Sequence, residues 1–464
     1  MKIAFFSSEV VPFAKTGGLA DVAGSLPIAL EKQGVEVAVI MPRYHTIKTN
    51  QNPVTIAQNV KVFFVGHPSY FSREGLYGDR YGDYPDNLER FSFFCKESLE
   101  LLKRIRFQAD CLHCHDWQTA LIPVYLETLY REDPFFAKTK TMITVHNLAY
   151  QGIFPKDQFP KTGLGWEYFN IEGLEFYDQV NLLKGGLNFS DRITTVSPTY
   201  AREIQTPESG HGLDGVLREH KDQLVGILNG IDYDQWNPQK DPHIAEHYSV
   251  NSIEKKQANK LDLQGMVDLP RYEKVPLIGI ISRLADQKGL DLIADIIEDL
   301  CAERIQLILL GTGDDVYHKL FVRIQKEYPR KTSIHLKFDA VLAQKIYAGV
   351  DLFLMPSHYE PCGLGQMISL RYGTIPIVRK TGGLADTIRD CDALINGNGF
   401  VFEPYSSKIL LETIQRALKA YQDPKRWLNL VKRAMQSDFS WDASAKEYVK
   451  LYTQVLQKST TSKV

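Results

Sequence analysis

The chain has 464 residues, of which 44% are hydrophobic and 24% are charged. A prior of roughly 150 residues per domain predicts two or three domains, and this hydrophobic content excludes a disordered chain. The net charge of −2 provides no basic field for nucleic acid or for an anionic membrane. No apolar run approaches the ~18 residues of a membrane span, so we expect no membrane partner. The six cysteines follow no regular spacing, which favours a reducing, cytoplasmic location.

The first half of the chain alternates predicted strands and helices. The stretch 23–34, AGSLPIALEKQG, predicts a helix that ends at Gly34. Strands are predicted for the short apolar segments 2–8, 35–42, 141–147 and 191–198. Because strand, loop, helix and strand follow one another in the order of a βαβ unit, the sheet should be parallel.

The alternation starts again after a polar stretch at 227–241, where we place the domain boundary. Strands are predicted at 275–284 and 305–315, and the segments DLFLMP and TIPIVR continue the pattern. The chain is therefore predicted to be an α/β protein with two similar domains.

One motif occurs twice. KTGGLADV at 15–22 recurs as KTGGLADT at 380–387, and seven of the eight residues are identical. Each copy follows an apolar strand and precedes a helix-like stretch. Ligands of parallel α/β sheets bind outside the carboxyl ends of the strands. The simplest interpretation is two Gly-rich turns that face one cleft.

The first copy has the composition of an anion site. Gly17 and Gly18 allow backbone N–H groups to approach a ligand closely, and Lys15 adds a mobile charge beside a helix N-terminus. These features suit a diphosphate, although neither the P-loop nor the GxGxxG pattern is present. A structural turn with a solvated lysine is the alternative.

Two further sets of polar residues follow predicted strands of the second half. In SRLADQKG, Arg283 and Lys288 provide two cations that would stabilise a diphosphate leaving group electrostatically, unless the loop is merely solvated. In HYEPCGLGQ, Glu360 provides a carboxylate for a sugar hydroxyl or for charge on a sugar ring, or else a turn residue. A single carboxylate does not provide the pair that glycosidases need.

Metal and dinucleotide interpretations have weak support. The run CLHCH contains one CxxC pair without a second pair at zinc spacing, and the DxD matches at 390–392 and 232–234 are short. GTGD at 311–314 lacks the third glycine of a dinucleotide fingerprint. We therefore expect neither a metal nor a bound cofactor.

In combination, these segments resemble the bacterial glycogen synthase and plant starch synthase family. The resemblance covers nearly the whole chain and rests on ordered motifs, among them SSEVVPFAKTGGLADVAGSLP, HCHDWQTALIP, TVHNLAYQGIF, GILNGIDYDQWNP, SRLADQKGLDL, PSHYEPCGLGQ and KTGGLADTI. It implies a GT-B glycosyltransferase fold, in which two Rossmann-like doubly wound domains face a deep cleft. The implied domains are 1–232 on the acceptor side, 233–440 on the nucleotide-sugar side, and a helical segment 441–464 that returns to the first domain.

The resemblance also implies an activity. Glucose would pass from ADP-glucose, or less favoured UDP-glucose, to the non-reducing end of an α-1,4-glucan or maltooligosaccharide with retention of configuration. The product would be glycogen or starch, and the enzyme would work in the cytoplasm or on the surface of glucan granules. No metal, cofactor or nucleic acid would take part.

Residue roles carry over by motif. Lys15 and Gly18 would bind donor phosphate, Arg283 and Lys288 would neutralise the leaving diphosphate, and Glu360 would hold the donor glucose. The backbone carbonyl of His146 would stabilise charge at the anomeric carbon. Further donor contacts are implied for Gly17, Cys362, Gly363, Leu364, Thr381, Gly382 and Gly383. Sugar or acceptor contacts are implied for Glu9, Tyr77, Asp116, Asn147 and Asn229.

One departure concerns the mechanism. Many related retaining transferases have a second glutamate eight positions after the first. In this chain that position is Ile368, and the family that it resembles commonly lacks the second glutamate too. Front-side attack, which needs no carboxylate pair, is therefore favoured. Three alternatives remain: a glucosyltransferase with a small acceptor, a non-catalytic glucan-binding or priming protein, and a pyridoxal-phosphate glucan phosphorylase, for which no cofactor motif is seen.

Overall fold

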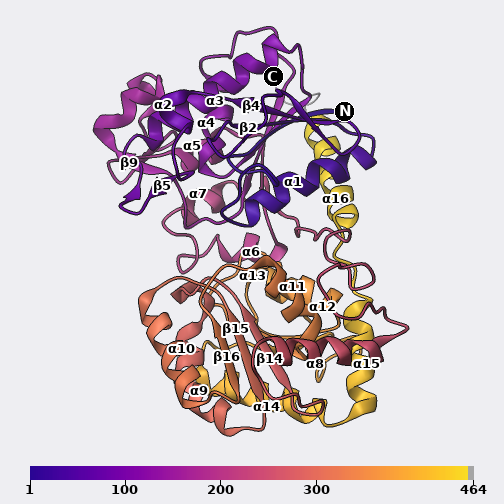
Figure 1. The fold of residues 1–464 in the computed structure, drawn as a ribbon. Helices are drawn as coiled ribbons and strands as arrows, with labels where there is room; N and C mark the ends of the chain where they lie inside the picture. Colours follow the sequence, from indigo (N-terminus) through magenta and orange to yellow (C-terminus); the bar gives the residue numbers. More distant parts are fainter. Residues whose placement is uncertain (458–464) are drawn as a thin grey trace. The chain divides into compact units, whose positions relative to one another are not determined.

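The computed structural model describes residues 1–457 and divides into two compact units. The first unit contains Met1–Gly230 together with the segment that starts at Trp441, and the second contains Ile231–Ser440 (Figure 1). The sequence interpretation placed the change of domain after residue 232. Residues 458–464 of the predicted final segment lie outside the described part of the chain.

The first unit is built on an eight-stranded sheet with the order β13-β12-β8-β7-β1-β2-β4-β3. Neighbouring strands are parallel except for the hairpin of β3 with β4. The strands are β1 (Lys2–Phe6), β2 (Glu36–Pro42), β3 (Val54–Ile56), β4 (Val60–Val65), β7 (Cys111–His115), β8 (Lys140–Val145), β12 (Arg192–Thr195) and β13 (Leu224–Gly226). Two small antiparallel sheets contain β5 (Gly78–Asp79), β6 (Gly82–Asp83), β9 (Ile153–Pro155), β10 (Glu175–Phe176) and β11 (Gln179–Asn181).

The helices of the first unit are α1 (Gly18–Lys32), α2 (Pro68–Phe71), α3 (Asn87–Arg104), α4 (Leu121–Glu127), α5 (Leu182–Phe189), α6 (Pro198–Glu203), α7 (Asp214–Glu219) and α16 (Trp441–Gln457). Helix α1 begins inside the KTGG motif, five residues before the predicted start at 23. The earlier start is explained by Leu19, Ala20 and Val22, which are buried on the same face as the rest of the helix. Helix α16 packs on α1, as Figure 1 shows.

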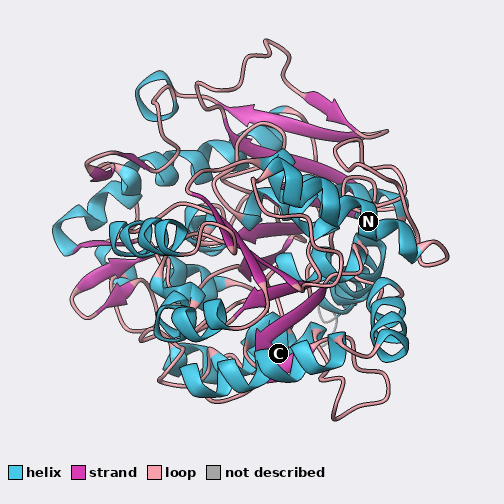
Figure 2. Cartoon of the chain, turned by 60° about the horizontal axis from the view of Figure 1, so that its bottom comes forward, coloured by secondary structure: helices cyan, strands magenta, loops and turns pink. Residues whose placement is uncertain are grey.

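The second unit is built on a six-stranded, fully parallel sheet with the order β16-β15-β14-β17-β18-β19. Its strands are β14 (Leu277–Ile281), β15 (Gln306–Leu310), β16 (Thr332–His335), β17 (Leu352–Met355), β18 (Ile375–Arg379) and β19 (Phe400–Phe402). The strands are nearly continuous buried apolar runs, which is the pattern of a parallel sheet covered on both faces. Figure 2 shows the strands of the chain among its helices and loops. The two parallel-sheet units confirm the predicted α/β class.

The helices of the second unit are α8 (Lys256–Met266), α9 (Leu290–Ala302), α10 (Asp315–Glu327), α11 (Ala340–Gly349), α12 (Gly365–Arg371), α13 (Gly382–Thr387), α14 (Ser407–Tyr421) and α15 (Pro424–Met435). Short 3₁₀ turns are η1 (Trp117–Thr119), η2 (Lys156–Thr162), η3 (Trp166–Tyr168), η4 (Ile253–Lys255) and η5 (Asp286–Lys288).

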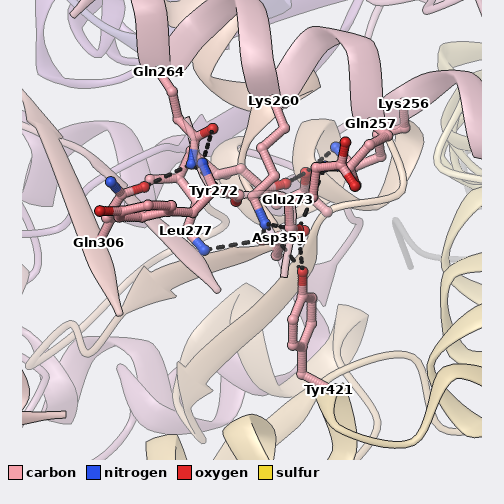
Figure 3. Close-up of polar contacts among 12 residues, drawn as sticks. Lys256, Gln257, Lys260, Gln264, Tyr272, Glu273, Leu277, Gln306, Asp351 and Tyr421 are labelled. Atoms are coloured by element: carbon pink, nitrogen blue, oxygen red, sulfur yellow. Dashed lines mark hydrogen bonds and ion pairs between the residues drawn. The ribbon is translucent and has the colours of Figure 1, made fainter. Parts of the chain in front are cut away.

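A buried ion pair fastens helix α8 to the sheet of the second unit (Figure 3). Lys260 Nζ lies 2.7 Å from Asp351 Oδ2, and only 2% of the lysine side chain is exposed. The same ammonium donates to the Glu273 carbonyl and the Tyr421 hydroxyl, and Asp351 also accepts from the backbone N–H of Leu277. The Lys260 ammonium and the Asp351 carboxylate therefore both have further hydrogen-bond partners, and such partners offset the cost of burying the two charges.

In each sheet the strand order reverses once, at a topological switch point. This point lies between β1 and β7 in the first unit and between β14 and β17 in the second. Such switch points open a crevice at the carboxyl ends of the strands, where ligands of doubly wound sheets bind. We therefore expect the ligand-binding residues on the loops that follow these four strands. No helix among residues 1–457 is long and apolar enough to cross a membrane.

Candidate active site

In the first unit, the polar residues singled out in the sequence lie at one edge of the sheet. Glu9 follows β1, Asp116 follows β7, His146 and Asn147 follow β8, and Asn229 follows β13. These four strands belong to the parallel part of the sheet, so their carboxyl ends share an edge.

Glu9 organises the loop that contains the first KTGG motif. Its carboxylate is 3% exposed and accepts hydrogen bonds from the backbone N–H groups of Thr16 and Gly17 and from the Thr16 hydroxyl. The Tyr77 hydroxyl donates to the same carboxylate at 2.6 Å and lies 2.7 Å from Ser8 Oγ. Burial raises the pKa of Tyr77 above its ordinary value, so the phenol stays protonated. The structure thus brings Glu9, Tyr77 and the loop together.

Lys15 pairs with an aspartate that the sequence interpretation did not single out. Its Nζ lies 2.7 Å from Asp21 Oδ1 in the first turn of α1, and 47% of the lysine side chain remains exposed. Burial raises the pKa of Asp21, partly offset by the hydrogen bond from Lys15. Asp21 belongs to the same motif, and its spacing of six residues from Lys15 was the available signal.

The two glycines of this first copy have no packing partner that would explain them. A Cβ atom added at Gly17 or Gly18 would have no described atom within 4 Å, and neither backbone has the left-handed φ that favours glycine. Gly17 is the N-cap of α1, where exposed N–H groups and the helix dipole favour an anion. The Gly17 N–H already donates to Glu9, so a phosphate that approaches closely would use the open space beside both glycines and the N–H of Gly18.

Asp116 holds the backbone that follows β8. It adopts a left-handed conformation with φ 55°, and its Oδ1 accepts from the His146 N–H at 2.7 Å. Burial raises the pKa of the Asp116 carboxyl to about 7, against the opposing effect of the backbone amides of His146 and Asn147. Asp116 therefore positions the peptide of His146, whose carbonyl is the predicted contact of the anomeric carbon.

Two other predicted contacts in this unit are placed differently. The Asn147 side chain accepts from the backbone N–H of Ala149 and so closes its own turn. Asn229 Oδ1 is buried and has no hydrogen-bond partner among residues 1–457. A buried acceptor without a partner is uncommon, so Asn229 has capacity for a ligand.

In the second unit, Lys288 and Glu360 form a pair at the switch point. Lys288 Nζ lies 2.7 Å from Glu360 Oε2, which also accepts from Ser357 Oγ at 3.1 Å. Glu360 is 6% exposed, so the carboxylate is fixed by its two donors. Arg283 follows β14 and bonds only loosely to Gln287 Oε1, at 3.3 Å. Both predicted cations and the predicted carboxylate thus lie on the loops after β14 and β17.

The second KTGG copy packs against the Glu360 loop. Gly382 has φ 44°, and a Cβ there would lie 2.0 Å from the Glu360 carbonyl oxygen, while a Cβ at Gly383 would lie 2.1 Å from that of Cys362. The Gly383 N–H donates to the Glu360 and Pro361 carbonyls. These glycines are therefore required by packing, in contrast to those of the first copy.

The rest of this loop is held by one buried amide. Gln366 Nε2 donates to the carbonyls of Cys362 and Gly363. These two bonds fix the backbone of the loop that leads to Leu364, the N-cap of α12. Thr381 is the N-cap of α13, and Lys380 pairs with Glu403 at 3.3 Å at the surface. The second lysine therefore does not repeat the arrangement of Lys15.

The short metal-like motifs have other partners in the structure. Asp390 and Asp392 form ion pairs with Arg416, and Asp392 also pairs with Arg426. Cys111 and Cys114 are buried in β7, where burial raises the pKa of both thiols. No group of three His, Cys, Asp or Glu residues within 1–457 is placed to hold a metal ion.

Comparison with known proteins agrees with this layout. Residues 2–219 match the family model of the starch synthase catalytic domain, and residues 265–433 match the model of glycosyl transferases group 1. The chain is 50% identical over 481 residues to a glycogen synthase of Geotalea uraniireducens, covering 99% of each protein. The chain belongs to the glycogen and starch synthase family of glycosyltransferases. A family member from Thermotoga maritima, also a glycogen synthase, is 48% identical over 488 residues, again with 99% of each protein covered.

Solved structures give the same assignment. The catalytic domain of starch synthase IV from Arabidopsis thaliana, bound to ADP and acarbose, superimposes with a TM-score of 0.90 at 34% identity and covers 98% of this chain and 99% of that one. A sucrose-phosphate synthase from Thermosynechococcus elongatus shares the fold alone, with a TM-score of 0.64 at 18% identity over 99% of this chain and 100% of that one. The predicted family and GT-B fold are confirmed.

Proposed function

We propose that this chain elongates an α-1,4-glucan by transferring glucose from ADP-glucose to its non-reducing end, with retention of configuration. The observation that supports this most strongly is the full-length identity of about half to glycogen synthases, with Lys15, Lys288 and Glu360 all present on loops at the switch points. That the related starch synthase IV is bound to ADP supports an ADP-linked donor over a UDP-linked one.

The donor's phosphates are held by cations and by backbone. Lys15 exchanges its contact with Asp21 for phosphate oxygen. Gly17 leaves space for the phosphate, and the open backbone of Gly18 contributes an N–H donor. Arg283 and Lys288 neutralise the diphosphate as it leaves. Thr381, Gly382 and Gly383 provide further donor contacts from the second KTGG loop.

The transferred glucose is held by the loop after β17. Glu360 accepts from sugar hydroxyls, and its bonds to Lys288 and Ser357 fix the carboxylate before the sugar arrives. Backbone groups of Cys362, Gly363 and Leu364 contact glucose or phosphate. Such preorganisation accelerates transfer because no reorganisation is needed when charge develops.

The reaction follows a front-side course. The acceptor 4-hydroxyl enters on the face that the diphosphate leaves, a new C1–O bond replaces the C1–O bond to phosphate, and a departing phosphate oxygen takes the hydroxyl proton. The His146 carbonyl stabilises the positive charge on the sugar ring. Position 368 is a buried isoleucine on α12, so no second carboxylate stands there for a two-step route. The protein's part is to position donor and acceptor and to stabilise the charge that develops during transfer.

Acceptor contacts are assigned to Tyr77, Asp116, Asn147 and Asn229. The unpaired Oδ1 of Asn229 supports a hydrogen bond to a glucan hydroxyl. Glu9 acts on the acceptor side mainly through the loop it holds, because its carboxylate already accepts from Thr16, Gly17 and Tyr77.

The test is the destination of labelled glucose. ADP-glucose is supplied together with glycogen and with a set of small sugars, and the label is expected in glycogen. Label found only in small sugars would replace the proposal with a small-acceptor transferase, and no transfer from any nucleotide-glucose would favour a binding or priming protein. Glu360→Ala and Lys288→Ala proteins that keep both their fold and near-normal turnover would refute the assigned mechanism.

A further inference from the structure

A chain of buried hydrogen bonds runs from helix α16 to β8, the strand that directly precedes His146. Tyr452 OH lies 2.7 Å from His113 Nδ1, and His113 Nε2 lies 2.7 Å from Thr144 Oγ1 in β8. All three side chains are fully buried. Tyr452 has no other hydrogen-bond partner among the described residues, so its proton must go to His113, because an unpaired buried O–H is costly. His113 is then protonated on Nε2 and donates to Thr144.

The ring of His113 fixes a second histidine. His115 packs against His113 with ring centroids 4.2 Å apart and against Phe5 with centroids 4.0 Å apart. Its Nδ1 lies 2.9 Å from Nε2 of His146, and its Nε2 is buried without a partner among residues 1–457. Burial lowers the pKa of His146 to about 3 and holds that of His115 well below its ordinary value, so both rings are neutral.

The hydrogen bond between the two rings contains one proton, which is more favourable on Nδ1 of His115 than on Nε2 of His146. A neutral imidazole has one N–H donor and one acceptor nitrogen. If His146 donated to His115, the proton of His115 would sit on Nε2, as a buried N–H without an acceptor. If His115 donates through Nδ1, only an acceptor nitrogen is left unpaired, and orphaned buried acceptors are better tolerated than orphaned N–H donors.

We propose that His115 is a positioning residue that donates its Nδ1–H to Nε2 of His146 and thereby fixes His146 as the Nδ1–H tautomer, ready to donate to a sugar hydroxyl oxygen. The inference rests on the proposed glucosyl transfer, because His146 is the residue whose carbonyl is assigned to the anomeric carbon. His146 is only partly buried, and its Nδ1 bonds to no described residue. The donor is thus free for substrate, while Asp116 holds the backbone of the same residue.

Two variants of His115 separate positioning from packing. In His115→Asn, the amide N–H stands where Nδ1–H stood, although the smaller side chain leaves a cavity beside Phe5 and His113. In His115→Phe, the ring and its stacking are kept but the donor is lost. Since Nε2 of His115 has no partner, the phenylalanine removes only one hydrogen bond from the fold.

The two variants are expected to rank in one order for thermal stability and in the opposite order for kcat/KM. His115→Phe should be the more stable to heat, yet kcat/KM should fall about tenfold, as expected for one hydrogen bond at the upper end of its range. His115→Asn should be the less stable but stay within about threefold of the parent in kcat/KM. Activity that follows stability in both variants, or an asparagine no better than phenylalanine, would overturn the proposal.

The tautomer can be read without substrate. In protein labelled with ¹⁵N-histidine, with the His146 signals assigned from a His146→Gln sample, Nδ1 of His146 should be protonated and Nε2 should not. His115→Phe should convert His146 to a mixture of tautomers. An Nε2–H form of His146 in the parent would overturn the inference. Absence of glucose transfer by the parent would instead contradict the proposed function and leave the spectroscopic result standing.

Discussion

The two copies of the KTGG motif predict opposite responses to the same substitution. Gly18→Ala places a methyl group where no described atom lies within 4 Å, on a backbone without left-handed strain. Because alanine is also the better helix former, the free energy of unfolding should be unchanged or raised by up to about 1 kcal/mol. The methyl group nevertheless fills the space assigned to the donor's phosphate.

Gly382→Ala is the matched control from the second copy. Its φ of 44° costs alanine about 1–2 kcal/mol. In addition, the Cβ would lie 2.0 Å from the Glu360 carbonyl oxygen, so backbone must move. This variant should lose stability and activity together.

The assay combines thermal unfolding with initial rates at varied ADP-glucose. Gly18→Ala should melt at or above the parent's temperature while kcat/KM for the donor falls by about tenfold or more, equivalent to about 1.4 kcal/mol. Parent-like kcat/KM in a stable Gly18→Ala protein would refute the reasoning that these glycines exist for a ligand. A parent-like melting temperature for Gly382→Ala would refute the packing argument for the second copy.

Three further predictions concern buried charge. Asp351→Ala leaves the Lys260 ammonium buried without its counter-ion and should lower the free energy of unfolding in urea by about 3–5 kcal/mol. The surface control Glu403→Ala should change it by less than about 1 kcal/mol. Equal losses in the two variants would contradict the role of burial. Burial lowers the pKa of His113 from 6.5 to about 3, so its contribution is present above pH 6.5 and declines as the pH falls. It should account for about 2 kcal/mol of stability lost between pH 7 and pH 5, and a His113→Gln protein with an unchanged pH slope would exclude it. Lys288→Met should lower kcat by about 100-fold or more, and it should also lower the melting temperature because Glu360 is left buried without its cation. A loss seen only in KM would argue against leaving-group stabilisation.

Much of the fold follows from pattern. The apolar runs at 35–42 and 275–284 became β2 and β14 because parallel strands buried on both faces must be apolar throughout. The start of α1 was missed because Gly17 and Gly18 are turn residues by local preference, whereas burial of Leu19 and Val22 extends the helix back to Gly18.

The candidate site was predicted in composition but not in contacts. Residues after strands were found because the carboxyl edge of a parallel sheet is where ligands bind. Sequence spacing does not show that Glu9 binds the loop of Thr16 and Gly17 or that Asp21 pairs with Lys15. Nor does it distinguish the two KTGG copies, because the difference lies in what surrounds each glycine.

The most direct test of the central claim is the initial rate of glucose transfer from ADP-glucose and from UDP-glucose, each with and without a maltooligosaccharide primer. We expect the highest rate with ADP-glucose and primer, with products that are each one or more α-1,4-linked glucose units longer at the non-reducing end. Products without chain extension, or no transfer from either donor in the presence of primer, would contradict the account.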